Sequence, residues 1–85
     1  NVKCPNELKG KVMEKITREF EALPKETVDG VKAFFPNGSA VLIRPSGTEP
    51  TIRIYAEAKS EDEVNNLIYR YRVFLEKVIK EVGVL

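Results

Sequence analysis

Near the start of the chain, apolar residues recur every three or four positions, which is the spacing of one face of an α-helix. Pro5 suits a first helical turn, whereas Pro24 cannot continue a helix, so the pattern predicts a helix over about residues 6–22. The apolar face of this helix consists of Leu8, Val12, Ile16, Phe20 and Leu23. The charged residues between them fall mostly on the opposite side.

After this helix the period changes to that of β-strands. Residues 27–35 form a candidate strand that Asp29-Gly30 interrupts, and this pair could itself be a turn. The Asn-Gly pair within residues 36–39 is the strongest short hairpin signal. We therefore expect a hairpin at this point of the chain.

Two further strands follow the hairpin. Residues 40–44 are a continuous apolar run, which is typical of a strand in the middle of a sheet. In residues 51–58 apolar and polar side chains alternate, so that one face of the strand is directed to the core. The other face carries Arg53 and Tyr55, and we expect it to lie open to solvent or to a partner.

The last third of the chain predicts a long helix. Ser60 and Glu63 form a predicted capping box. In this motif Ser60 is the N-cap, and the side chain of Glu63, at the third helical position, accepts a hydrogen bond from the backbone N–H of Ser60. Gly83 suits the C-terminal cap. The apolar stripe of this helix comprises Val64, Leu67, Ile68, Tyr71, Leu75, Val78, Ile79 and Val82.

The predicted order of elements is α-β-β-β-α. We expect an α+β fold: a two-layer sandwich in which two helices pack on one face of an antiparallel sheet of three to four strands. With 85 residues, the chain should form one domain, residues 1–85. Because it begins with Asn1 rather than Met, we expect a fragment or a processed product of a longer protein.

Composition excludes several classes of function. The net charge is +1, from 14 basic and 13 acidic side chains, whereas a dedicated nucleic-acid binder usually has a strong basic excess. Cys4 is the one cysteine, so no internal disulfide can form, which fits a reducing, cytoplasmic compartment. The sequence has no histidine, so a metal site of the usual zinc ligands and histidine-based catalysis are not expected. No apolar run is long enough for a membrane span.

The segment "RPSGTEP", residues 44–50, concentrates hydrogen-bond donors between two predicted strands. Gly47 permits a left-handed or otherwise unusual backbone, which would let successive N–H groups point into one concavity. Ser46 and Thr48 add hydroxyl groups, and Arg44 and Arg53 can reach back over the loop from the two strands. Converging donors of this kind match a phosphate dianion.

The same residue types also occur in ordinary turns, so a purely structural loop is the alternative. The segment is not a P-loop, because it lacks the GxxxxGK[ST] pattern and the strand-to-helix context. Glu49 alone makes a poor metal site. It could instead hold an arginine or accept a hydrogen bond from a sugar hydroxyl.

The string "RPSGTEPTIRIYAEA" resembles the phosphate-binding loop in the C-terminal domain of the α-D-phosphohexomutases. That superfamily contains phosphoglucomutase, phosphomannomutase and phosphoglucosamine mutase. Its motif is an Arg, a variable residue, Ser-Gly/Asn-Thr and a later Arg, and all of these are present in this sequence. The resemblance implies that Arg44, Ser46, Gly47 and Thr48 hold the non-reacting phosphate of a hexose phosphate, with Arg53 in support.

The resemblance further implies a phosphoserine and a Mg²⁺ site in other domains of a longer enzyme. This sequence contains neither a catalytic-serine motif nor an Asp-rich metal loop, so we expect no catalytic residue, metal or cofactor in this chain. Its expected partners are the hexose phosphate and the preceding domains, without nucleic acid or membrane. The loop motif is compatible with phosphoglucosamine mutases and with bifunctional glucose/mannose enzymes; we favour the latter.

Two other classes of function stay open at this point. One is a freestanding, non-catalytic module that binds a phosphorylated ligand through the same loop. The other is an α+β nucleic-acid-binding domain that uses the open face of its sheet, a reading that requires more basic and aromatic side chains than Arg53 and Tyr55 alone supply.

Overall fold

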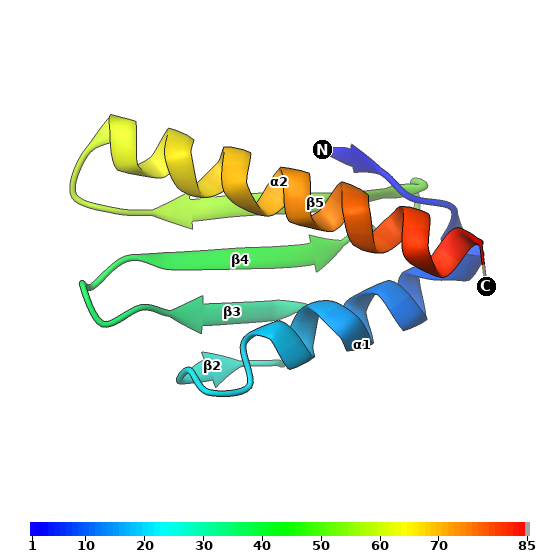
Figure 1. Cartoon of the computed structure of the whole chain (residues 1–85), viewed down its shortest axis with the longest axis horizontal. Helices are drawn as coiled ribbons and strands as arrows, with labels where there is room; N and C mark the ends of the chain where they lie inside the picture. Colours follow the sequence, from blue (N-terminus) through cyan, green and yellow to red (C-terminus); the bar gives the residue numbers. More distant parts are fainter. Residues whose placement is uncertain (85) are drawn as a thin grey trace.

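A computed structural model describes residues 1–84 of the chain. Five antiparallel strands form a single sheet in the order β1-β5-β4-β3-β2, and two helices cover one of its faces (Figure 1). The two-layer α+β prediction is therefore confirmed. In chain order the elements are β1 Val2–Lys3, the 3₁₀ turn η1 Asn6–Leu8, α1 Lys9–Glu19, β2 Lys25–Glu26, β3 Val31–Phe34, β4 Ala40–Pro45, β5 Thr51–Glu57 and α2 Glu61–Gly83.

The sheet has more strands than the three to four predicted. The additional strands, β1 and β2, contain two residues each and form the two edges of the sheet. Strands this short have no hydrophobic period, so the sequence pattern could not reveal them. Val2 pairs with Ile52 and is buried, whereas Lys25 pairs with Ala33.

The first helix is shorter than predicted. It begins as the 3₁₀ turn η1, becomes an α-helix at Lys9 and ends at Glu19, three residues before the expected boundary. The N–H of Phe20 bonds to Thr17, and the N–H of Leu23 bonds to Phe20, so the chain tightens into turns before Pro24. The apolar spacing continues past the helix because these turn residues still pack on the core.

One hydrophobic core lies between the sheet and the helices. From α1 it receives Val12 and Ile16, and Phe20 follows directly after the helix; all three are almost completely buried. The ring of Phe20 packs against Tyr71 of α2 and Phe35, with centroid distances of 5.3 and 6.4 Å. The remaining buried apolar members are Val2, Cys4, Val31, Ala33, Val41, Ile43, Ile52, Leu75, Val78 and Val82.

The N-terminal end of α2 is capped as predicted, since the Ser60 hydroxyl accepts a hydrogen bond from the N–H of Glu63 at 3.2 Å. The returning bond from the Glu63 side chain is not among the hydrogen bonds of residues 1–84. Gly83 is the last helical residue rather than a residue beyond the helix, and Val84 takes the cap position. No helix of residues 1–84 is both long and apolar enough to cross a bilayer.

Candidate functional site

The predicted loop connects β4 to β5 at one end of the sheet, where it forms the tip of a hairpin. Arg44 of β4 and Arg53 of β5 are direct cross-strand partners. Side chains in such positions have Cβ atoms about 4.5–5.5 Å apart, and two like charges placed opposite each other destabilise the pair. Because the pairing itself gains nothing from two cations, the arrangement suits an anion placed between or above them.

The Arg44 guanidinium is oriented by a carboxylate. Its Nε donates to Oδ2 of Asp29 at 2.9 Å, and both side chains are about half exposed or more. Asp29 lies in the turn that precedes β3. The next residue, Gly30, has φ = +80°, and a Cβ on it would lie 2.3 Å from the carbonyl oxygen of Ile43. The glycine therefore lets the turn approach β4 closely enough for Asp29 to reach Arg44.

The sequence leaves two roles open for Glu49: it could hold an arginine or accept a hydrogen bond from a sugar hydroxyl. Among residues 1–84, however, Glu49 forms no ion pair, and the acid beside Arg44 is Asp29. The Asp29-Gly30 turn was recognised in the sequence, but its relation to Arg44 depends on the pairing of β3 with β4. This positioning residue was therefore missed.

Arg53 is half-buried. Its Nε and the Thr51 hydroxyl are buried without a hydrogen-bond partner among residues 1–84. A buried donor without an acceptor is costly, and such groups are uncommon in native proteins. Arg53 thus retains donor capacity next to the loop.

Ser46 organises the loop with its side-chain oxygen. This Oγ accepts the N–H of Glu49 at 3.1 Å and, with a longer bond of 3.4 Å, the N–H of Thr48. The hydroxyl proton is then free to be donated outward, since a serine hydroxyl both accepts and donates. The N–H of Ser46 bonds to the carbonyl of Thr51 and closes the hairpin at 3.0 Å.

Gly47 does not adopt the left-handed backbone that was allowed for it. Within residues 1–84, positive φ occurs only at Gly30 and Gly38. Gly47 is exposed, and a Cβ on it would meet no atom within 4 Å. Neither backbone strain nor packing in this chain requires a glycine here, so a requirement for it would have to come from a molecule that approaches the loop.

Lys9, the first residue of α1, contacts the loop from the helix layer. Its ammonium donates to the carbonyl oxygen of Ser46 at 2.7 Å and to that of Glu49 through a second, short hydrogen bond. The N–H of Cys4 also bonds to Pro50 at 2.8 Å. Because Lys9 lies 37 residues before Ser46 in the chain, no local sequence signal indicated this role.

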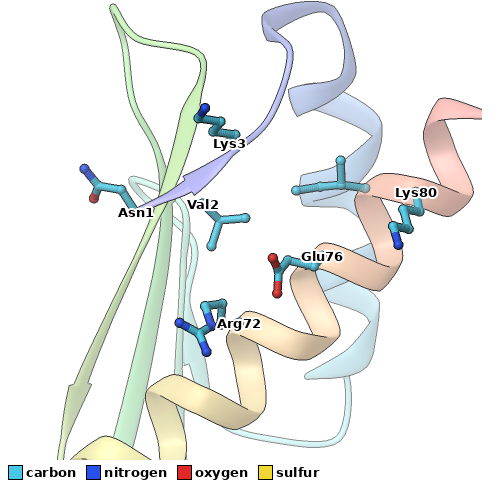
Figure 2. Close-up of a pocket in the computed structure, with 7 residues that line it drawn as sticks. Asn1, Val2, Lys3, Arg72, Glu76 and Lys80 are labelled. Carbon is cyan, nitrogen blue, oxygen red and sulfur yellow. The ribbon is translucent and has the colours of Figure 1, made fainter.

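A separate hollow of about 530 Å³ lies between β1 and α2, lined by residues such as Lys3, Arg72, Glu76 and Lys80. Arg72 and Glu76 project from α2 toward β1 (Figure 2). None of its lining residues belongs to the 44–53 segment, so it is distinct from the predicted site.

The described residues offer no group of three or more His, Cys, Asp or Glu side chains that could hold a metal ion. Asp29, which pairs with Arg44, and Glu49, which lies in the loop, do not form such a set. Burial raises the pKa of the Cys4 thiol, because the charged form would have to lose its hydration. The buried thiol faces the core and takes no part in the loop.

Residues 1–70 match the model of a protein family described as the phosphoglucomutase/phosphomannomutase C-terminal domain. A probable phosphoglucosamine mutase of Methanothermobacter thermautotrophicus is 43% identical over 83 residues, which cover 92% of this chain. The phosphoglucosamine mutase of Methanococcus vannielii is 52% identical over 68 residues, or 76% of the chain. A phosphopentomutase of Thermococcus kodakarensis is 38% identical over 87 residues, or 95% of the chain.

These relatives are much longer than the chain, which covers 18%, 15% and 19% of their respective lengths. The similarity extends from the first strand through the loop and into α2. On this match the chain belongs to the family of phosphoglucomutase/phosphomannomutase C-terminal domains.

Proposed function

We propose that this domain holds the non-reacting phosphate group of a sugar phosphate within a larger phosphohexomutase. The observation that carries the proposal is the direct pairing of Arg44 with Arg53 beside the Ser46–Glu49 loop. The two guanidinium groups supply positive charge, and the Ser46 hydroxyl supplies a hydrogen-bond donor that no other group within residues 1–84 uses. Thr48 is exposed and adds a second hydroxyl at the tip of the loop.

In this proposal the chemistry takes place elsewhere in the parent chain. A phosphoserine in a preceding domain exchanges phosphate with the sugar, and Mg²⁺ binds in another domain. The loop contributes by binding a remote part of the substrate, and that binding energy orients the reacting group. Toward the substrate, Ser46 acts as a hydrogen-bond donor and not as a nucleophile, while its Oγ accepts the N–H groups of Thr48 and Glu49.

The residues of this loop indicate a phosphate group more clearly than they indicate which sugar carries it. Two of the relatives are phosphoglucosamine mutases by name, and we therefore propose a hexosamine phosphate in preference to the glucose or mannose phosphate favoured from the sequence. A similar domain in a phosphopentomutase fits a loop that contacts phosphate and leaves the sugar to other domains. Comparing glucosamine, glucose and mannose 6-phosphates as substrates of the parent enzyme tests this choice.

The phosphate-binding role can be tested on this chain by NMR. Inorganic phosphate or glucosamine 6-phosphate should shift the backbone amide signals of Arg44, of residues 46–48 and of Arg53, and Arg44→Ala should abolish the response. Arg70→Ala is the matched control, because Arg70 is an exposed arginine on α2 outside the loop. A wild-type chain without any response, or equal effects of the two substitutions, would show that the anion site is misplaced.

A further inference from the structure

Lys9 lies outside the segment 44–53, yet its side chain contacts the loop. Its ammonium donates to two main-chain carbonyl oxygens, those of Ser46 and Glu49, one on each side of the loop tip. An ammonium group has three donors, so it can serve two acceptors at once. Without a cation between them, these two carbonyl dipoles would converge on the same point and repel each other.

The direction of the Ser46 carbonyl determines the direction of the next N–H group. In a planar trans peptide the C=O and the following N–H point in opposite directions. Residues 1–84 contain no cis peptide bond. Because the Ser46 carbonyl is directed at Lys9 and hence toward α1, the N–H of Gly47 is directed away from α1.

The other N–H groups of the loop are already engaged. The N–H groups of Thr48 and Glu49 bond to the Ser46 hydroxyl oxygen, and the N–H of Ser46 bonds to Thr51. For the N–H of Gly47, no acceptor is found among residues 1–84. The main-chain donor that the loop leaves free is thus the one whose direction Lys9 sets.

We propose that Lys9 is a positioning residue for anion binding, which fixes the Ser46–Gly47 peptide so that the Gly47 N–H is presented to the phosphate. Lys9 acts through the loop and does not touch the anion. The inference rests on the proposed function, because it assumes that the loop binds phosphate. This role also explains why residue 47 is a glycine although it is exposed and has no positive φ. Because glycine has no side chain, the anion can approach the Gly47 N–H closely.

The test compares Lys9→Met with Lys11→Met in the ¹⁵N-labelled chain, titrated with inorganic phosphate. Lys11 lies on the same helix and is exposed, so its loss changes the net charge equally. Lys9→Met should move the Gly47 amide signal before any phosphate is added. It should also weaken phosphate binding about three- to tenfold, the equivalent of about one ordinary hydrogen bond, because the Gly47 N–H is no longer held toward the phosphate. Lys11→Met should do neither, and Lys9→Arg should restore most of the binding.

Equal weakening by both methionine variants would mean that only net charge matters and would overturn the inference, as would an unchanged Gly47 signal. If the wild-type chain does not respond to phosphate, the proposed function fails, while the Gly47 signal of the phosphate-free variants still tests the orienting role. Should Lys9→Met not fold, relaxation of the wild-type ammonium ¹⁵N signals decides. The Lys9 ammonium should be restricted relative to that of Lys11, and equal mobility would refute the contact.

Discussion

Replacing Gly30 by alanine should destabilise the domain severely. The added Cβ would lie 2.3 Å from the Ile43 carbonyl oxygen and 2.9 Å from the Arg44 Cα, and both of these neighbours are backbone atoms that cannot rotate away. The residue also has φ = +80°, a conformation that alanine rarely adopts. Relief of the contact would have to separate β3 from β4 beside the Val31–Ile43 pair.

The size of the effect follows from these two contributions. A left-handed backbone costs a residue other than glycine about 1–2 kcal/mol. Parting the strands adds the loss of about one ladder hydrogen bond and local strain, together about 2–3 kcal/mol. The expected loss in the free energy of unfolding is therefore about 3–5 kcal/mol. That is a large share of the roughly 4–13 kcal/mol typical of a domain of this length.

Gly38→Ala is the matched control. Gly38 also has a positive φ, +91°, but a Cβ on it would meet no atom within 4 Å. It should therefore show only the backbone cost of about 1–2 kcal/mol. Urea denaturation followed by far-UV circular dichroism measures both changes. If Gly30→Ala cost no more than Gly38→Ala, the close approach of the turn to β4 would be refuted, and with it the account of how Asp29 reaches Arg44.

Ser60→Ala should lower the free energy of unfolding by about 1 kcal/mol, measured by urea denaturation, because the first turn of α2 loses its side-chain acceptor. Burial raises the pKa of Tyr71 because the folded state favours the neutral phenol. The stability that this shift contributes is complete below the ordinary pKa of 10.0 and is lost as the pH rises above that value. Urea midpoints between neutral and alkaline pH should then fall less steeply in Tyr71→Phe, whereas Tyr69→Phe, at an exposed position, should behave as wild type. In urea denaturation, Asp29→Asn should lower the free energy of unfolding by less than about 1 kcal/mol in low salt and by almost nothing at about 1 M NaCl. The reason is that the ion pair of Asp29 with Arg44 is exposed to solvent and is screened by salt.

Features with a repeating pattern or a local hydrogen bond could be predicted from the sequence. The stripe from Val12 to Phe20 is buried because a helix on a sheet must cover one face. The Asn37-Gly38 turn formed as expected, with Gly38 at positive φ and the Asn37 side chain accepting from Ser39. In each case the controlling interaction lies within a few residues of the signal.

What could not be predicted depends on tertiary pairing. The contact of Lys9 with the loop joins residues 37 and 40 positions apart, and Asp29 reaches Arg44 only after β3 and β4 have paired. Of the two alternatives allowed for the Gly47 backbone, the left-handed one does not occur, since positive φ within residues 1–84 is found only at Gly30 and Gly38. The predicted loop does lie between two strands, β4 and β5, but no sequence signal indicated Lys9 and Asp29, the residues behind it that contact it.

The long sequence separation of the Lys9 contacts has a consequence for the order of folding. The β3–β4 and β4–β5 hairpins join segments close in the chain, whereas α1 reaches the loop only when distant parts come together. Such non-local contacts are slow to form because a large loop must first be closed. We expect the hairpins and α2 to assemble first and the loop to acquire its final shape last, when α1 docks. The same contacts should open most readily in the native state, so that hydrogen exchange at residues 46–49 would report fluctuations of α1.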